Sequence, residues 1–544
     1  MTSSPASAGT PGLRAAWQRH RVQVLALLAV VGASLAYRVY VASECSLWFD
    51  EASTIHDVDA PLPELLRGPS REHPPLMFWL VRLATALLGR SELGLRAVSL
   101  AFGCLLLLAV YLLALELGLG ATRALVPVAS LAVTPFFIRH ATEARQYAMM
   151  AAFTTLATVF ALRLLARPLR LSWLVGLAVC SVAAAATHFF ALPYALVLWG
   201  SVAVGTLRAW KLRTLPARDR KLLVGVVVAS VLLLGLLCAD LFGLVRYYAH
   251  HALGRGGHHL ALASVWRAFS FLARPPWDPA YEALVSALGL VVVAVRSRGL
   301  ARIIPLGMAF PPVAAVTLLS SGHMFTPRYL WPSFVFYHFG EVSAVLALIE
   351  FVTWCVARAG ALARRLSVVA WLVLLVPFQA RLSEFPTGFG AGGSINYRAL
   401  QRYFGGDRAE DTALVVYVGY AGTRIMGSAY PVPHLLTLEH FEPLPGITRY
   451  LVAEFDSSDH RLHSEFAPLL KRQLGLSRSQ WRALPQAKLA GNRFQRAARA
   501  RLVVLDPAES REGARATGPQ APSPEPAEHA NEDESGPAPD DGED

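Results

Sequence analysis

Long apolar runs separated by short polar loops limit what this chain can fold into. Such runs lie at about residues 22–42, 95–119, 124–138, 147–166, 171–187, 189–207, 222–242, 281–295, 303–320, 329–353 and 366–382. A helix needs about 20 predominantly apolar residues to cross a bilayer, and several of these runs have that length. The pattern predicts an α-helical polytopic membrane protein with about 11 transmembrane helices.

The composition excludes a wholly soluble protein. Hydrophobic residues make up 54% of the 544 residues and charged residues only 16%, whereas ordinary soluble domains contain about 25% charged residues. Residues 1–505 hold 48 basic and 26 acidic side chains. Their arginines form short clusters between apolar runs, which is typical of the positive-inside rule and not of a nucleic-acid-binding face. We therefore expect a lipid bilayer as a partner and no nucleic acid.

The positions of the arginines also predict an orientation. Residues 76–89 are apolar but too few to span a bilayer, and they include Arg82, so we place them at the membrane interface. All arginine-rich loops then fall on the side of the N-terminus, which the rule makes cytoplasmic. These loops are 163–170, 208–221, 296–302 and 358–365. The expected location is the cell (inner) membrane, with multiple passes.

Four parts follow from this interpretation. They are a cytoplasmic N-terminus (1–21), a transmembrane domain (22–382) with an outer loop (43–94), an extracytoplasmic α/β domain (383–505) and a disordered acidic tail (506–544). The α/β domain is expected because alternating segments at 412–418 and 449–455 replace the apolar runs. The tail has too few apolar residues to bury a core.

Acidic residues gather in the first outer loop. Of the 16 acids in residues 1–380, seven lie within residues 44–72, although acids near a membrane are costly. Asp50 and Glu51 directly follow two aromatic residues, so we expect them close to the bilayer surface, where partial desolvation suits a carboxylate for general-base work. Alternatively, Asp50 only caps an interfacial helix that runs to about Leu66. The spacing leaves both interpretations open.

Further polar residues are predicted on the same face. His73 precedes two prolines, which favour an extended backbone. Its imidazole suits a phosphate oxygen or a metal ion, but a solvated loop histidine fits equally. Glu143 and Tyr147 share a helix face if the turn between them is helical, while Arg145 points elsewhere. A structural pair between Glu143 and Arg145 is the alternative.

Two more positions lie at the ends of apolar runs. Arg328, followed by Tyr329, stands just outside a span, where a guanidinium group suits a phosphate but also snorkels to the interface. His188, between two apolar runs, is either a ligand-binding residue or a satisfied corner histidine. Residues 250–259 contain four histidines but match no usual metal-ligand spacing.

Together these residues resemble a known family. The motifs are Asp50-Glu51, His73-Pro74-Pro75-Leu76, Gly89-Arg90-Ser91-Glu92 leading to Arg96, Glu143 to Tyr147, and Arg328-Tyr329. They are similar to motifs of the GT-C glycosyltransferases, in particular the family 39-like group of protein mannosyltransferases, aminoarabinose transferases and RgtA/B/C/D-like enzymes. The similarity is clearest over residues 40–200. Aminoarabinose transferases carry a lysine where His73 stands, which favours the RgtA/B/C/D-like subgroup.

The resemblance implies inverting transfer of a sugar from a polyprenyl-phosphate-linked donor to a lipid, glycan or protein acceptor on the outer face. It implies that Asp50 is the base and Glu51 its orienting neighbour, within a GT-C-like catalytic domain. The candidate substrate-binding residues are His73, Glu143, Arg145, Tyr147, His188, Arg328 and Tyr329. No cofactor is assigned with certainty, and metal dependence stays open, because the carboxylates and His73 together suit a divalent metal ion.

A multi-span transporter or flippase of lipid-linked envelope precursors is the alternative. Such a protein is expected to have broken helices and acids near mid-bilayer in symmetry-related halves. Glu341 and Glu350 are the main acids inside the later apolar runs, and neither has a counterpart in a repeat. A non-enzymatic envelope assembly protein is a further alternative, but it would not need the acid cluster at the outer surface.

Overall fold

The computed structural model describes residues 13–47, 49–67, 73–166, 170–211, 225, 228, 279–297, 304–313 and 327–359, and five strands between 412 and 504. The tail at 506–544, the histidine-rich stretch at 250–259 and the apolar run at 366–382 lie outside these residues, as does nearly all of the run at 222–242.

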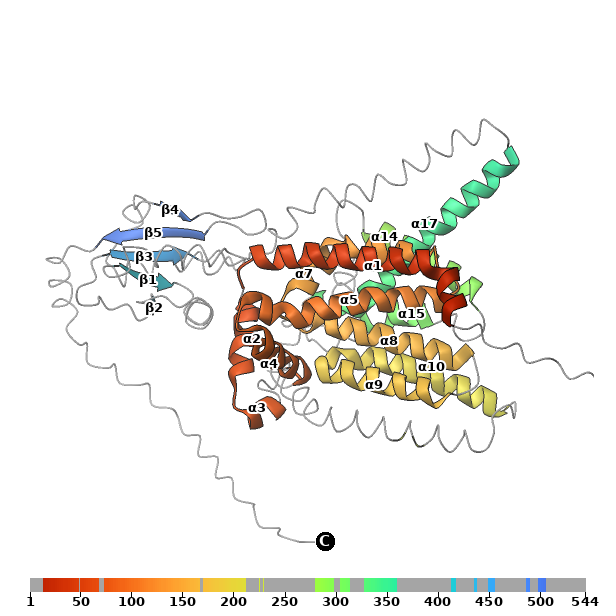
Figure 1. Ribbon diagram of the computed structural model, residues 1–544, viewed down its shortest axis with the longest axis horizontal. Helices are drawn as coiled ribbons and strands as arrows, with labels where there is room; N and C mark the ends of the chain where they lie inside the picture. The colour runs from red at the N-terminus through yellow and green to blue at the C-terminus, as the bar shows by residue number, and fades with distance from the viewer. Residues whose placement is uncertain are drawn as a thin grey trace, which may run out of the picture.

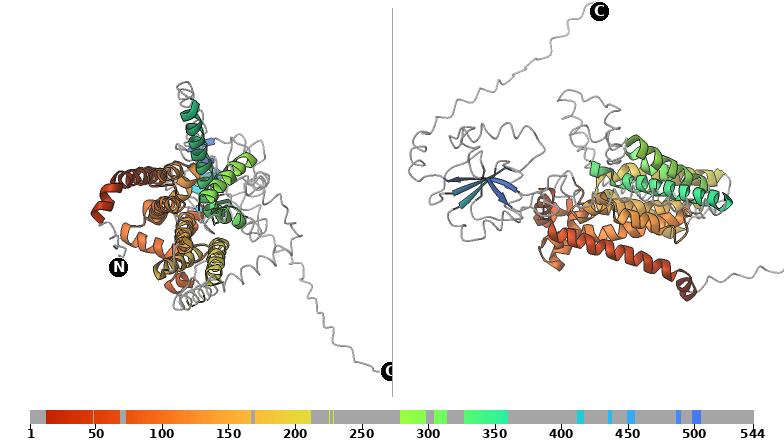
Figure 2. Two further views of the ribbon diagram at one scale, coloured as in Figure 1. Left: turned by 90° about the vertical axis from the view of Figure 1, so that its right-hand side faces the viewer. Right: turned by 90° about the horizontal axis from the view of Figure 1, so that it is seen from above.

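Helices make up the described part of the chain before residue 360. The long ones run side by side, and the short α2, α3 and α4 lie at one end of the bundle (Figure 1 and Figure 2). They are α1 (Leu13–Glu44), α2 (Phe49–Asp59), α3 (Leu62–Arg67), α4 (Leu76–Leu88), α5 (Glu92–Glu116), α6 (Leu125–Ala132), α7 (Pro135–Thr142), α8 (Tyr147–Ala166), α9 (Leu171–Thr187), η1 (Phe189–Ala191), α10 (Leu192–Lys211), α14 (Pro279–Arg296), α15 (Ile304–Ala309), η3 (Pro327–Leu330) and α17 (Trp331–Ala359).

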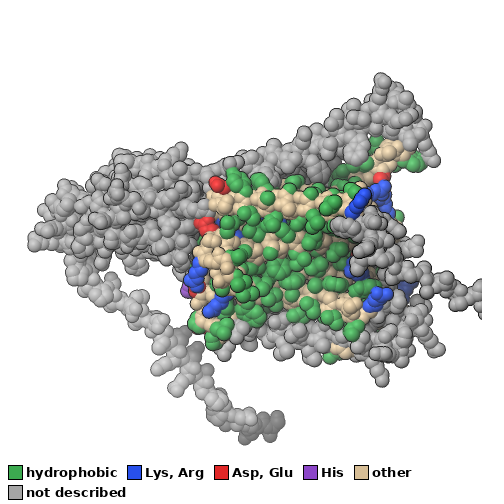
Figure 3. All heavy atoms as spheres, viewed as in Figure 1, with side chains coloured by type: hydrophobic (Ala, Val, Ile, Leu, Met, Phe, Trp, Pro, Cys, Tyr) green, Lys and Arg blue, Asp and Glu red, His purple; other side chains and the backbone are tan. Residues whose placement is uncertain are grey.

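Five of the described helices are long and apolar enough to cross a membrane, or six if one bent pair counts as a span. Helices α8 and α9 coincide with the runs predicted at 147–166 and 171–187. The visible face of the bundle is a band of apolar side chains, with charged side chains toward its two ends (Figure 3). The protein is therefore an α-helical membrane protein. The total of eleven crossings stays a prediction.

The run at 124–138 is not one straight helix, and our prediction was wrong in this respect. Helices α6 and α7 meet at an angle of 68°. Pro135 has no N–H to donate to the preceding turn, and the residue before it, Thr134, is extended with ψ 125°. Because proline is tolerated only in the first turn, Pro135 ends one helix and begins the next.

A second predicted helix is also divided. The interfacial helix expected to run from Asp50 to about Leu66 consists of α2 and α3, which are separated at Ala60 and Pro61. Proline again explains the break, because the residue before it avoids helical angles. Helix α4, in contrast, is a single apolar helix of 13 residues, too short to span, as expected for residues 76–89.

Ion pairs mark one end of the bundle. The carboxylate of Glu116, at the end of α5, lies 2.7 Å from Arg163 of α8. Glu350 of α17 pairs with Arg123 at 2.5 Å and with Arg296 at 2.6 Å. All three arginines belong to the side that the sequence predicts to be cytoplasmic.

The opposite end of the bundle gathers the polar residues predicted for the outer face. Its contacts join α2, His73, the turn at 143–146 and Arg328. Since α6 begins just after Arg123 at the first end and α7 leads into this turn, the bent pair traverses the bundle as one broken span.

Five strands form one mixed sheet in the order β2-β1-β3-β5-β4. Strand β1 pairs in parallel with β2 and β3, while β5 pairs antiparallel with β3 and β4. Strands β1 and β3 lie where alternation predicted strands, at 412–418 and 449–455. The bounds are β1 (Thr412–Val416), β2 (Leu435–Thr437), β3 (Arg449–Glu454), β4 (Gln486–Leu489) and β5 (Ala498–Val504). The helices expected between the strands fall outside the described residues.

Candidate active site

Asp50 forms an ion pair with Arg328. Its carboxylate oxygen Oδ2 lies 2.7 Å from Nη1 of Arg328, and the two side chains are 16% and 21% exposed. Helix α2 begins at Phe49, so Asp50 lies in its first turn. The capping interpretation stays a prediction, and the geometry places the Asp50 carboxylate beside a guanidinium group, partly open to solvent.

Arg145 joins this pair from the turn between α7 and α8. Its buried guanidinium group donates from Nη1 to the carbonyl of Asp50 at 3.3 Å. Nη2 lies 3.1 Å from Nε2 of His73, and the side-chain amide of Gln146 is 3.3 Å from the other ring nitrogen. The fold therefore brings His73, Arg145 and Asp50 together, although they are far apart in the sequence.

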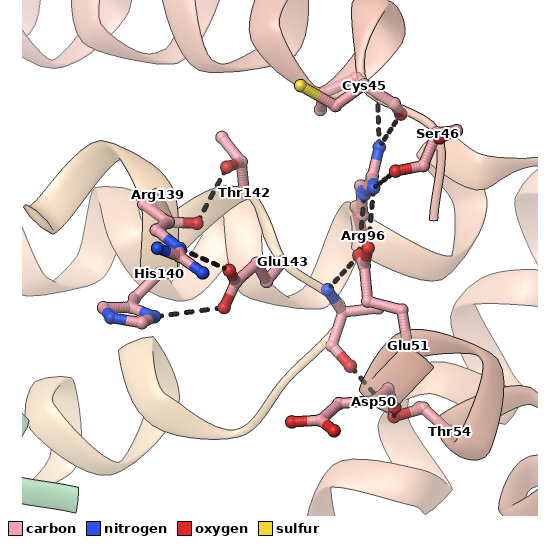
Figure 4. A network of polar contacts seen from close by, with 12 residues as sticks. Cys45, Ser46, Asp50, Glu51, Thr54, Arg96, Arg139, His140, Thr142 and Glu143 are labelled. Carbon is pink, nitrogen blue, oxygen red and sulfur yellow. Dashed lines mark hydrogen bonds and ion pairs between the residues drawn. The ribbon is translucent and has the colours of Figure 1, made fainter. Parts of the chain in front are cut away.

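Glu143 has a structural role, as the alternative interpretation expected, but the ion pairs of its carboxylate are not with Arg145. Residues 143–146 are not helical, and Glu143 itself is extended with ψ 141°. The predicted shared face with Tyr147 therefore does not form. Instead, the Glu143 carboxylate pairs with Arg139 and His140, each at 3.0 Å (Figure 4). Burial alone would raise the pKa of Glu143, but these two partners outweigh it and lower the pKa below its usual value.

Glu51 is fully buried and holds several segments in place. Its two carboxylate oxygens accept hydrogen bonds from Arg96 at 2.8 and 2.7 Å, and one of them also accepts the N–H of Ala144 at 2.7 Å (Figure 4). Arg96 donates further to the carbonyls of Ala42 and Cys45, each at 2.6 Å. The pair thus ties the end of α1, α2 and α5 to the turn that carries Arg145.

Sequence reasoning gave Arg96 no role of its own. The available signal was an arginine one turn inside an otherwise apolar helix, close in the chain to the acid cluster. A buried charge requires a partner of opposite sign, so this arginine predicts a buried carboxylate. The side chain of Asp50, next to Glu51, points away from this pair (Figure 4).

His188 lies behind these residues at the junction of α9 and η1. Its Nδ1 accepts the N–H of Phe190 at 3.2 Å, which caps η1. The ring centre lies 5.1 Å from that of Tyr329 and 5.9 Å from that of His73. Burial, followed by the positive charges of Arg145 and Arg328, lowers the pKa of His188 to about 3, so the imidazole is neutral.

Aromatic rings pack against both arginines. The guanidinium carbon of Arg328 lies 5.6 Å from the ring centre of Tyr147, and that of Arg145 lies 6.0 Å from it. Tyr329 packs on Phe190 with ring centres 4.8 Å apart. These contacts favour a fixed orientation of the two cations.

All the predicted site residues therefore lie at one end of the bundle. Asp50, His73, Arg328 and Tyr329 are partly exposed, while Arg145 and His188 are buried behind them. One carboxylate beside two guanidinium groups is suited to accept a proton and to bind an anion. No group of three or more histidine, cysteine or acidic side chains is placed to hold a metal within the part of the chain that the structure describes.

The family model of the dolichyl-phosphate-mannose-protein mannosyltransferases matches residues 72–237. This match confirms the resemblance to family 39-like GT-C glycosyltransferases over the residues that it covers. None of the curated proteins matches this chain.

The chain also has some similarity to solved structures. ArnT from Cupriavidus metallidurans bound to undecaprenyl phosphate is 15% identical, with 89% of this chain and 98% of that chain covered and a TM-score of 0.47. The oligosaccharyltransferase AglB from Archaeoglobus fulgidus, in complex with an inhibitory peptide and a dolichol-phosphate, is 12% identical, with 86% and 73% covered and a TM-score of 0.43.

Proposed function

We propose that this protein is an inverting glycosyltransferase that moves a sugar from a polyprenyl-phosphate-linked donor to a lipid, glycan or protein acceptor on the outer face of the membrane. The observation that carries the proposal is the Asp50 carboxylate paired with Arg328 at one end of an apolar helical bundle, where Arg145 holds the backbone carbonyl of Asp50. The match to the dolichyl-phosphate-mannose-protein mannosyltransferases supports it, because the sugar donor in that family's name is linked to a lipid phosphate.

The arrangement provides both groups that such a transfer needs. Asp50 takes the proton of the acceptor hydroxyl, whose oxygen forms a bond to the anomeric carbon of the sugar. The bond from that carbon to the phosphate oxygen breaks on the opposite face, so the configuration inverts. The departing polyprenyl phosphate gains negative charge, which Arg328 and Arg145 stabilise.

The ion pair between Asp50 and Arg328 suggests an order of binding. While the two are paired, the guanidinium group of Arg328 competes with the acceptor hydroxyl for Asp50. The phosphate of a bound donor is an alternative anion for Arg328, because a guanidinium group binds phosphate through two parallel hydrogen bonds. Donor binding then releases Asp50, so the donor binds before the acceptor.

The transporter alternative has no comparable support. Glu350 is paired with two arginines at the end of the bundle away from Asp50. Glu341 lies 3.4 Å from His338 on its own helix. Both acids thus have basic neighbours, and neither lies at the end of the bundle that holds Asp50.

Release of polyprenyl phosphate tests the function directly. Purified protein in nanodiscs is incubated with a panel of polyprenyl-phosphate hexoses and pentoses and with lipid, glycan and peptide acceptors. We expect release with at least one donor, and a fall of roughly 10² to 10⁴ in turnover for Asp50→Asn, because an amide keeps the size but cannot accept the proton.

Asp59→Asn is the matched control. Asp59 lies on the same helix, α2, but pairs with Arg90 at the surface. Such exposed pairs contribute little, so near-normal turnover is expected. Equal turnover in Asp50→Asn and the wild type would remove Asp50 from the mechanism, and no release with any donor would contradict the proposed function.

A further inference from the structure

His188 keeps one hydrogen-bonding atom unused inside the candidate active site. The residue is 3% exposed, and its Nδ1 already accepts the N–H of Phe190. Its Nε2 is buried and has no hydrogen-bond partner among the residues that the structure describes. Buried polar groups are nearly always satisfied, so an unsatisfied one at a site points to a ligand that completes it.

The contact with Phe190 fixes which nitrogen carries the hydrogen. A neutral imidazole has one donor and one acceptor nitrogen, and Nδ1 is the acceptor here. Nε2 therefore carries the N–H. Because burial and the nearby arginines keep the ring neutral, this nitrogen is a donor without a positive charge.

The surroundings of the ring define the ligand class. The rings of His73 and Tyr329 both lie near that of His188, and both Arg145 and Arg328 are close enough to act on it electrostatically. A group that accepts from an N–H and also pairs with two guanidinium groups is an oxyanion. A third cation at this position would be repelled by the two arginines, whereas a neutral donor is not.

We propose that the Nε2–H of His188 donates a hydrogen bond to the phosphate group of the lipid-linked donor, together with Arg145 and Arg328. This inference rests on the proposed function and names a residue that binds the leaving group. His188 then has two separate roles, since Nδ1 caps η1 and Nε2 binds phosphate.

Two isosteric substitutions separate these roles. In His188→Asn the side-chain oxygen takes the place of Nδ1 and keeps the cap, but nothing replaces Nε2. In His188→Gln the amide nitrogen takes the place of Nε2 and keeps the donor, but the cap is lost. His188→Asn should therefore weaken phosphate binding more than His188→Gln does, whereas His188→Gln should lower stability more than His188→Asn does.

Equilibrium binding of undecaprenyl phosphate to detergent-purified wild type and both variants is the first measurement. We expect roughly 10- to 100-fold weaker binding in His188→Asn, because a hydrogen bond to a charged group is lost, and less than about 5-fold in His188→Gln. Thermal unfolding should show the reverse order, with His188→Gln the less stable variant. Binding of inorganic phosphate, measured in parallel, distinguishes a free anion from the lipid. Weak or absent binding of inorganic phosphate supports the lipid-linked group as the ligand. Binding as tight as that of undecaprenyl phosphate overturns that assignment.

Equal undecaprenyl phosphate binding in the wild type and His188→Asn would overturn the proposal, as would equal loss of binding in both variants. If His188→Asn does not fold, ¹⁵N NMR of histidine-labelled wild type decides, because one protonated Nε2 signal should shift on adding undecaprenyl phosphate and an unchanged spectrum contradicts the role. Sugar transfer is assayed separately on the wild type. If the wild type transfers sugar but the His188 variants bind undecaprenyl phosphate normally, this inference alone is contradicted. If binding depends on His188 but no donor supports transfer, the proposed function alone is contradicted.

Discussion

At the scale of single residues, the buried pair of Glu51 and Arg96 shows how one ion pair positions a site. Both carboxylate oxygens are engaged, so Glu51 has no free oxygen with which to receive a substrate proton. Its contact with the N–H of Ala144 fixes the turn that carries Arg145. Under the proposed function, the adjacent acids of the Asp50-Glu51 motif thus have different tasks: Asp50 takes part in the chemistry, and Glu51 holds the turn in place.

Removing one partner of this pair should be costly. In Glu51→Gln the guanidinium group of Arg96 stays buried without its counter-charge, and we expect a loss of about 3–5 kcal/mol in stability. The measurement is thermal unfolding in detergent. Glu64→Gln, at an exposed position of α3, is the control and should change stability by less than about 0.5 kcal/mol.

A double variant tests the interpretation of that result. In Glu51→Gln combined with Arg96→Gln no uncompensated charge remains, so the combined loss should be smaller than the sum of the two single losses. Additive losses would mean that the two residues act independently and that their pairing does not position the turn.

The neutral state of His188 predicts a pH dependence of stability. The pKa of His188 is about 3 in the folded protein, while a histidine in an unfolded chain has a pKa of about 6.5. Between these values the unfolded state binds a proton that the folded state does not, so stability is full above pH 6.5 and falls as the pH decreases toward 3. At pH 5 the loss from this residue is roughly 2 kcal/mol.

His188→Asn removes this titration while keeping the cap. The melting temperature of the wild type should therefore fall more than that of His188→Asn between pH 7 and pH 5, with all other groups common to both. A constant difference between the two proteins over this range would contradict a neutral, buried His188.

At the scale of elements, α14 and α17 pack through two glycines. A Cβ atom added at Gly289 would lie 1.8 Å from the carbonyl oxygen of Gly340 and 2.7 Å from the backbone nitrogen of Ala344. Since these are backbone atoms, the helices must separate to admit a methyl group. Residue Arg328, in η3, directly precedes α17, so this separation also moves the partner of Asp50.

Gly289→Ala is therefore expected to destabilise the protein by about 1–3 kcal/mol and to lower turnover. Gly200→Ala, in α10, is the control, because nothing lies within 4 Å of the added Cβ. There the better helix propensity of alanine should raise stability by about 0.5–1 kcal/mol. Thermal unfolding and polyprenyl phosphate release measure both effects, and equal behaviour of the two variants would contradict close packing of α14 on α17.

Particular elements show what the sequence could and could not predict. The runs at 147–166 and 171–187 match α8 and α9 because no proline interrupts their apolar pattern. Hydropathy alone did not detect the bend at Pro135, since an apolar run looks the same whether it is straight or bent. The contacts of Arg145 depend on that bend and on the non-helical turn after it, so side-chain partners were beyond sequence reasoning even where the residues themselves were identified.

At the scale of the whole molecule, the two ends of the bundle are chemically distinct. One end holds the pairs of Glu116 with Arg163 and of Glu350 with Arg123, and the other holds Asp50 with Arg328. The positive-inside rule assigns the first end to the cytoplasm. If this prediction holds, the candidate active site lies on the outer face, where our proposed function requires it.

Labelling of single cysteines with a membrane-impermeant thiol reagent tests this orientation. In a background without the native cysteines, Asp59→Cys at the Asp50 end should react in intact cells, because this side chain is 40% exposed. Arg123→Cys, 59% exposed at the opposite end, should react only after the membrane is permeabilised. A reporter fused after about residue 383 should also read extracytoplasmic, since eleven crossings from a cytoplasmic N-terminus end outside.

Reversed labelling would place Asp50 in the cytoplasm, where an acceptor on the outer face could not reach it. This result would overturn the sidedness of the proposed reaction but would leave its chemistry intact.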